Sequence, residues 1–119
     1  MRKISQDAAY ALLNGLTFNR NNTCIIFERD TNICKLYLHG NLIAQIKQSD
    51  ILHITLAGWD TVTTKSRLNA ILALILHDTK IKTIKGALAL RTYDTKYVFN
   101  ADDTLQIDLI TKQIIKLGA

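Results

Sequence analysis

Apolar residues follow two different periods in the first half of the chain. They first recur at i, i+3, i+4 and i+7, the spacing of an amphipathic helix, at Ala9, Leu12, Leu13 and Leu16. Ser5 precedes them, and its hydroxyl is suited to cap such a helix. From Thr23 the period changes to two, and four runs predict strands at 23–28, 33–39, 42–47 and 51–56. This half of the chain therefore predicts one short helix followed by four strands.

The turns between these runs allow the strands to be aligned. A loop at 29–32 places Ile25 opposite Leu36, and a loop at 39–41 places Leu38 opposite Leu42. The four strands then share one apolar face: Ile25, Phe27, Cys34, Leu36, Leu38, Leu42, Ala44, Ile46, Leu52, Ile54 and Leu56. The opposite face is mixed: Cys24, Ile26, Lys35, Tyr37, His39, Gln45 and His53. Because all four strands agree, we predict an antiparallel meander with one buried face.

A second helical stripe follows the predicted meander. It contains Leu68, Ile71, Leu72, Ile75 and Leu76. Thr63 or Thr64 is placed to cap this helix, which we expect to cover the apolar face of the sheet. Farther on, strands are predicted at 80–84, 87–91 and 96–100, with Leu90 opposite Phe99. The last fifteen residues fit both periods, and we expect a strand followed by a short helix or tail.

These elements predict an α+β fold: a short N-terminal helix, an antiparallel four-stranded meander packed by one amphipathic helix, and a smaller β-rich C-terminal part. At 119 residues the chain has the usual length of one domain, so we expect residues 1–119 to form a single domain. The longest apolar run, 70–76, is too short to cross a bilayer, and no signal-peptide pattern follows the basic start. We therefore expect a cytoplasmic protein.

Positive charge is concentrated in one part of the sequence. The formal net charge is +5, and residues 65–96 hold seven Lys and Arg against Asp78 and Asp94. Such a stretch suits contact with nucleic acid or an acidic protein surface, and it also suits a solvated face that favours solubility. The candidate partner-binding residues are Lys80, Lys82, Lys85, Arg91, Lys96 and Tyr93.

Common catalytic signatures are missing from the sequence. It contains no GxxxxGK[ST], HExxH or GxSxG motif, and Glu28 is its only glutamate. The three histidines are scattered, and no CxxC occurs, so no metal site is expected. Cys24 and Cys34 fall on opposite faces of their hairpin and are expected to be reduced. We predict that the protein is not an enzyme and uses no cofactor.

Two segments carry a resemblance to known proteins. Residues 37–44 read YLHGNLIA, and residues 56–70 read LAGWDTVTTKSRLNA. In this order they resemble a set of small, largely uncharacterised proteins of bacterial tailed phages, in which YLHGNxIA is followed by LAGWxTxTTxxRLNAL. The resemblance covers residues 4–76 and leaves 78–119 as a divergent C-terminal extension. It implies a phage origin and a role in infection, without implying a known reaction.

The second of these segments allows two interpretations. A Trp, several hydroxyls and an Arg near a helix start could hold an anion. The same residues also suit structural roles, with Trp59 covering the core and Arg67 pairing with Asp60. The alternative site residues are Trp59, Thr61, Thr64, Arg67, Tyr37 and His53.

From these observations we predict a small non-catalytic phage protein that binds a host protein or ribonucleoprotein in the cytoplasm of the infected cell. The expected role is inhibition of a nucleic-acid-directed defence system, as an anti-CRISPR protein does. Mimicry of DNA is disfavoured because the chain is basic. The alternative is a DNA- or RNA-binding accessory protein with Tyr93 or Tyr97 stacking on bases. Its phosphate contacts would be Lys65, Arg67, Lys80, Lys82, Lys85, Arg91 and Lys96.

Overall fold

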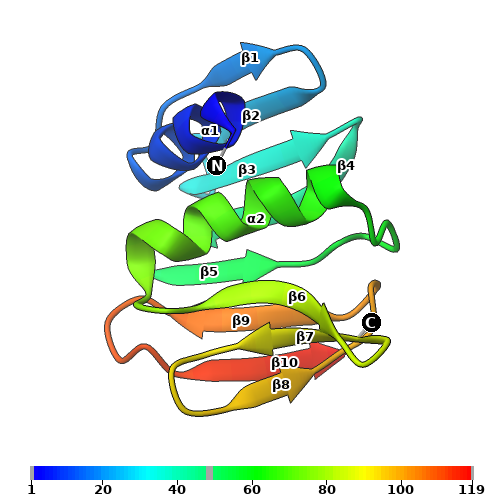
Figure 1. Ribbon diagram of the computed structural model, residues 1–119. Coiled ribbons are helices and arrows are strands. Elements are labelled where there is room, and N and C mark those ends of the chain that lie inside the picture. The colour runs from blue at the N-terminus through cyan, green and yellow to red at the C-terminus, as the bar shows by residue number, and fades with distance from the viewer. Residues whose placement is uncertain (1, 48–49, 119) are drawn as a thin grey trace.

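Two antiparallel sheets and two helices make up the protein, which is known here from a computed structural model that describes residues 2–47 and 50–118 (Figure 1). The elements are α1 (Lys3–Leu13), β1 (Phe18–Arg20), β2 (Thr23–Glu28), β3 (Ile33–Leu38), β4 (Asn41–Lys47), β5 (Ile51–Ile54), α2 (Val62–Ile75), β6 (Lys80–Ile84), β7 (Ala87–Arg91), β8 (Lys96–Val98), β9 (Thr104–Asp108) and β10 (Ile114–Gly118). The predicted α+β class is confirmed. Neither helix is long and apolar enough to cross a membrane in the part of the chain described.

The larger sheet has seven strands in the order β1-β2-β3-β4-β5-β9-β10. The predicted four-stranded meander is its middle, and β1 is an added edge strand. β9 returns to pair with β5, so the C-terminal hairpin extends this sheet. The expectation of a helix or tail after β9 is wrong, because the pairing of Ile114 with Ile107 continues the ladder as β10. The smaller sheet, β6-β7-β8, is formed by the chain between β5 and β9.

The helices and the smaller sheet lie on the same side of the larger sheet (Figure 1). The Asn69 side chain of α2 joins these parts, because its amide donates to the Ile81 carbonyl (3.0 Å) and accepts from the Ile81 N–H (2.6 Å). Lys65 Nζ donates to Thr83 Oγ1 (3.1 Å) one helical turn earlier. The polar edge of β6 is thus covered by a helix, and the outer face of β6–β8 is fixed relative to α2.

The predicted register is mostly confirmed. Ile25 pairs with Leu36, and Ala44 pairs with Ile54, so the inner face of the larger sheet is buried as expected. The pairing of Leu38 with Leu42 is wrong, because a bulge shifts the register between β3 and β4. The extra residue turns Ile43 into the core, at 1% exposure, and leaves Leu42 only half-buried.

Three local expectations also differ from the structure. Ser5 is buried inside α1 instead of capping it, because α1 starts at Lys3. Thr61 caps α2, since its Oγ1 accepts from the Thr64 N–H (3.1 Å). Leu90 pairs with Tyr97 and not with Phe99, because β8 ends at Val98.

Both cysteines are free, as the register requires. Cys24 is half-exposed on the outer face of the larger sheet, whereas Cys34 is buried in the core. Burial raises the pKa of the Cys34 thiol, because the thiolate is poorly solvated there.

This difference predicts two labelling classes. At pH 8 a maleimide is expected to modify Cys24 in the folded protein and Cys34 only after unfolding, because the thiolate is the reactive form. Mass spectrometry before and after adding urea, without reductant, checks this. Equal labelling rates of both thiols in the folded protein would contradict the burial of Cys34.

Candidate functional site

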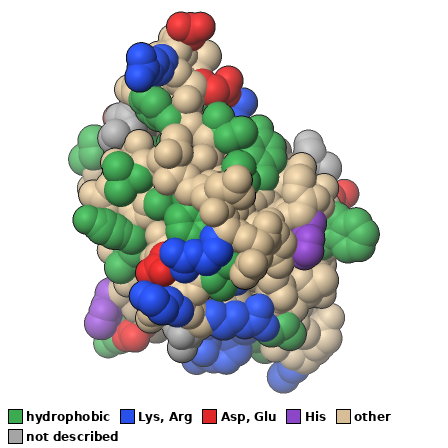
Figure 2. Space-filling view, turned by 90° about the horizontal axis from the view of Figure 1, so that it is seen from above, with side chains coloured by type: hydrophobic (Ala, Val, Ile, Leu, Met, Phe, Trp, Pro, Cys, Tyr) green, Lys and Arg blue, Asp and Glu red, His purple; other side chains and the backbone are tan. Residues whose placement is uncertain are grey.

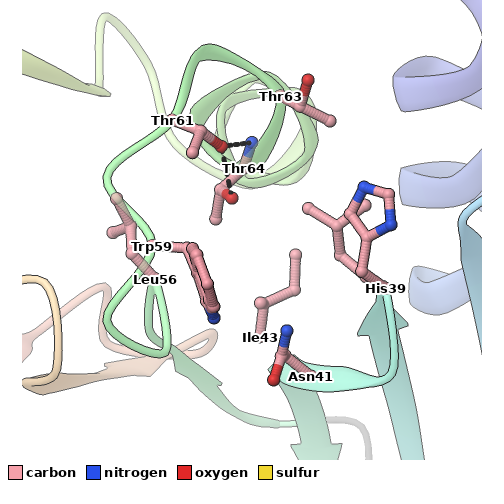
Figure 3. A pocket seen from close by; sticks show the side chains of 9 residues that line it. His39, Asn41, Ile43, Leu56, Trp59, Thr61, Thr63 and Thr64 are labelled. Carbon is pink, nitrogen blue, oxygen red and sulfur yellow. Dashed lines mark hydrogen bonds between the residues drawn. The ribbon is translucent and has the colours of Figure 1, made fainter.

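The two distinctive sequence segments meet at one pocket. Its volume is about 460 Å³, and it opens between the β3–β4 turn and the start of α2 (Figure 3). The lining residues are Leu38, His39, Asn41, Ile43, Leu56, Trp59, Thr61, Thr63 and Thr64. Residues far apart in the chain, from YLHGNLIA and LAGWDTVTTKSRLNA, therefore form a single concave surface.

Tight turns place the two walls of this pocket. His39 and Gly40 both have left-handed backbone conformations, with φ of +51° and +79°, which reverses the chain between β3 and β4. On the other side, Gly58 has φ +85°, and its N–H donates to the Ala101 carbonyl (3.0 Å). These turns present His39 and Trp59 on opposite sides of the pocket (Figure 3).

Trp59 does not cover the core as expected. Its side chain is 58% exposed and stands beside the pocket (Figure 3). Leu56 and Ile43, which are almost fully buried, already fill the core beneath it. The indole is therefore available for contact with another molecule, since an exposed Trp contributes little to folding.

The hydroxyls at the start of α2 are largely committed to the fold. Thr61 Oγ1 caps the helix and lies 2.8 Å from the Thr64 hydroxyl, and Thr64 is buried. Asp60 pairs with Lys65 (2.7 Å), so the expected pairing of Asp60 with Arg67 is wrong. Thr61 and Thr64 therefore have the structural role of capping and closing the first turn of α2.

Arg67 lies under this region in a buried polar network. It is 3% exposed and donates to Ser5 Oγ (2.7 Å), Thr23 Oγ1 (3.0 Å) and Asn22 Oδ1 (3.2 Å). Burial lowers the pKa of its guanidinium, and the positive charge of Arg2 adds to this effect. Among the described residues, no carboxylate forms a salt bridge with Arg67. Neutral oxygens therefore hold a buried cation between α1, β2 and α2.

This network also orients His39. Because Arg67 can only donate, the Asn22 atom that it contacts must be the amide oxygen. The Asn22 nitrogen then lies 3.3 Å from His39 Nε2, which must accept its proton. In a neutral imidazole this contact places the ring proton on Nδ1. The buried arginine and the wall of the pocket are linked through a single asparagine.

A second candidate surface covers the outer face of the smaller sheet. Lys80, Arg91 and Lys96 form a row of cross-strand neighbours, and Lys82 lies in the next row. Lys85 extends from the β6–β7 turn with φ +51°. The salt bridges of the described residues involve Lys3, Arg20, Lys35, Lys65 and His77, and none of these five cations. Tyr93, in the turn between Arg91 and Lys96, is 82% exposed.

Comparison with known proteins adds one result. The family model for the Kyanoviridae Gp96 protein matches residues 1–110. The chain belongs to this phage protein family. No curated protein and no solved structure matches it. The residues that form the pocket, the Arg67 network and the smaller sheet all lie within the part of the chain that the Gp96 family model matches.

In this member of the Gp96 family the predicted site residues do not form one site. Lys80, Lys82, Lys85, Arg91, Lys96 and Tyr93 share the smaller sheet and its turns. Trp59, Thr61 and Thr64 line the pocket, and Arg67 is buried. Tyr37 and His53 lie on the outer face of the larger sheet, where His53 is held between Gln45 (3.2 Å) and Gln106 (2.9 Å).

The sequence reasoning missed one wall of the pocket. Asn41 and Ile43 were not candidates, and His39 was placed only on the outer sheet face. A usable signal was present, because both residues of the His39-Gly40 turn lie in the YLHGNLIA segment. The Ser5 and Asn22 contacts with Arg67 had no sequence signal, since serine and asparagine in these positions also suit caps and turns.

Proposed function

We propose that this Gp96 family member is a non-catalytic binding protein that docks on a host macromolecule through the outer face of β6–β8. The observation that carries the proposal is a set of five cations that form no salt bridge with any residue the structure describes: Lys80, Lys82, Lys85, Arg91 and Lys96. Unneutralised charges close together on a sheet raise the local potential and speed association with an acidic surface.

The composition of this surface fits a protein partner. Val98 is 54% exposed and Tyr93 is 82% exposed, so apolar and aromatic area lies among the cations. Arg and Tyr are enriched at protein interfaces, where aromatic side chains contribute much of the affinity. Figure 2 looks onto the end of the molecule that carries β1 and shows Lys and Arg side chains gathered on the side on which the helices lie, whereas β6–β8 lie toward the opposite end (Figure 1).

The family gives the biological setting for this proposal. A small phage protein with a basic docking face would act in the cytoplasm of the infected host cell on a host protein or ribonucleoprotein. We propose inhibition of a nucleic-acid-directed defence system, in the manner of an anti-CRISPR protein. The chain would use no cofactor or metal in this role, because binding alone blocks the target.

Charge reversal tests this proposal. The double variant Lys82→Glu with Lys85→Glu is expected to lose the protection that the wild-type chain gives a targeted phage in a host with an active CRISPR system. It should also lose capture of the host component that the wild type retains. The melting temperature should change little, because surface substitutions usually shift stability by no more than about 0.5 kcal/mol. Plaquing efficiency, affinity capture and thermal unfolding are the measurements.

The matched control is Lys112→Glu with Lys116→Glu. Each pair combines one strand lysine, half-buried at Lys82 and exposed at Lys116, with one lysine in a left-handed turn, at φ +51° for Lys85 and +65° for Lys112. The change in net charge is identical, and the two pairs differ chiefly in their position on the molecule. Equal loss in both double variants would contradict a docking role of the smaller sheet, as would full activity of the first variant.

The exposed Tyr93 between Arg91 and Lys96 favours a second candidate, direct binding of DNA or RNA. A base would stack on the tyrosine while the two cations contact phosphates. In that case the pure protein should retain oligonucleotides, and the logarithm of its affinity should fall with salt by about one unit of slope per phosphate contact. An inhibitor directed at protein should retain little nucleic acid.

A further inference from the structure

We propose that the pocket formed by the two sequence motifs is a binding site for an uncharged nucleobase, with the base lying against Trp59. The ligand would be either a free nucleoside or an unpaired base of a nucleic-acid strand. This site is separate from the basic sheet, and none of its lining residues belongs to β6–β8. The inference therefore goes beyond the proposed docking function.

The first argument is the shape and apolar floor of the pocket. Its volume of about 460 Å³ is within the range of small-molecule sites, about 300 to 1,000 Å³. Leu38, Ile43 and Leu56 form its base and are almost completely buried, so a ligand would rest on a rigid core surface. The Trp59 ring stands along one side as an exposed flat wall (Figure 3). A flat wall next to an apolar floor suits a planar ring.

The second argument is the chemistry of the rim. Among the described residues that line it there is no Asp, Glu, Lys or Arg, and the lining hydroxyl of Thr63 accepts from Arg2 (3.2 Å). Hydrogen bonds among the described side chains occupy Thr61 and Thr64 and leave the Asn41 amide and the Trp59 indole N–H free. Across the pocket, His39 Nε2 lies 3.3 Å from the Asn22 amide nitrogen, which is its donor. Free amide and N–H groups favour a ring with a polar edge, because a purely hydrocarbon ring would leave them unpaired once water is displaced.

A nucleobase meets these conditions together. It is planar, uncharged and carries donors and acceptors along one edge, and base stacking on an aromatic side chain does not depend on sequence. An asparagine side chain can form two hydrogen bonds with such an edge. The preorganised walls favour binding, because the β3–β4 turn and the Gly58 turn are already fixed by backbone contacts.

Intrinsic fluorescence provides a direct test, because Trp59 is the single tryptophan of the chain. Adenosine, uridine and a short single-stranded oligonucleotide are titrated into the full chain, with ribose as the control without a ring. A saturable change in emission with the nucleosides and none with ribose is expected. A response to the oligonucleotide alone would assign the base to a strand, and a response to nucleosides would assign it to a free ligand.

Two variants connect binding to the pocket, with ligand-observed NMR as the readout because Trp59→Ala removes the fluorophore. Trp59→Ala should weaken nucleobase binding at least about fivefold, the lower end for loss of a stacked base. Asn41→Ala should also weaken it, whereas Tyr10→Ala, which removes an exposed ring on α1, should not.

Several outcomes would overturn the assignment. The first is no saturable response to any nucleoside or oligonucleotide. The second is binding that Trp59→Ala leaves unchanged, which would place the base elsewhere, for example at Tyr93. The third is an equal response to N-acetylphenylalanine amide, a ring without a polar edge, which would show an unspecific apolar pocket. These variants leave the basic face of β6–β8 intact. A negative result would therefore count against the nucleobase site and not against the docking proposal.

Discussion

Replacing Leu72 by alanine is expected to lower the free energy of unfolding by about 2 to 5 kcal/mol, the usual range for removing a buried leucine side chain. Leu72 is 0% exposed and lies in the core cluster that joins α2 to both sheets. The deletion removes apolar contacts and leaves a cavity that a core packed from several sides cannot easily close. Urea unfolding followed by circular dichroism measures the change.

The same helix offers a matched control. Leu74 lies two residues away on the outer side of α2 and is 59% exposed. Leu74→Ala makes the same chemical change with the same effect on helix propensity. It should therefore lower the free energy of unfolding by no more than about 0.5 kcal/mol. Similar losses for both variants would be inconsistent with the packing of α2 on the larger sheet.

The packing of this helix was predictable from sequence because burial and periodicity coincide. Leu68, Ile71 and Leu72 recur at helical spacing, and all three are buried as expected. The register of β2 with β3 was predictable for a similar reason: an apolar face and a short loop leave few alignments. Local patterns therefore account for α2 and the middle of the larger sheet.

Other parts depend on contacts that no local pattern specifies. β9 pairs with β5 although residues 55–103 separate the two strands in the sequence. An alternating apolar run predicts a strand but does not indicate which sheet edge that strand will join. The bulge opposite Leu36 and Tyr37 places Ile43 in the core where the sequence predicted Leu42, and the two side chains are equally apolar. In each case the residue types allow several arrangements, and packing against distant segments selects one.

The candidate site shows the same division. The basic residues of β6–β8 come together because short hairpins connect their strands, and the sequence was sufficient to group them. The pocket requires the β3–β4 turn and the start of α2 to meet across the sheet, so the sequence identified its motifs and not their common surface. Arg67 was misassigned because Lys65, two residues earlier, takes the carboxylate of Asp60.

Arg67→Ala is expected to lower the free energy of unfolding by about 2 to 4 kcal/mol, because oxygens buried without a donor cost about 1 to 3 kcal/mol each. Ser5 Oγ, Thr23 Oγ1 and Asn22 Oδ1 all lose a hydrogen bond from the guanidinium. Asn22 Oδ1 still accepts from the Thr23 hydroxyl (2.9 Å) and Ser5 Oγ stays beside Ser66 Oγ (2.8 Å), so the Thr23 oxygen is the one left without a donor. Part of this loss is offset, since the variant no longer buries a charge without a carboxylate. The matched control is Arg91→Ala, which removes an exposed arginine and should cost no more than about 0.5 kcal/mol.

A second variant separates the charge of Arg67 from its geometry. Arg67→Lys keeps a cation, but one ammonium on a flexible stem cannot reproduce a planar group that reaches three oxygens in different directions. We expect it to remain destabilised and to weaken the contact of Asn22 with His39, because the Asn22 amide oxygen would then be held by the Thr23 hydroxyl alone. Urea unfolding and the ¹⁵N shifts of the His39 ring report the two effects separately. Full stability of Arg67→Lys with an unchanged His39 tautomer would mean that charge alone suffices, and that the link from the buried arginine to the pocket wall is not what holds His39 in place.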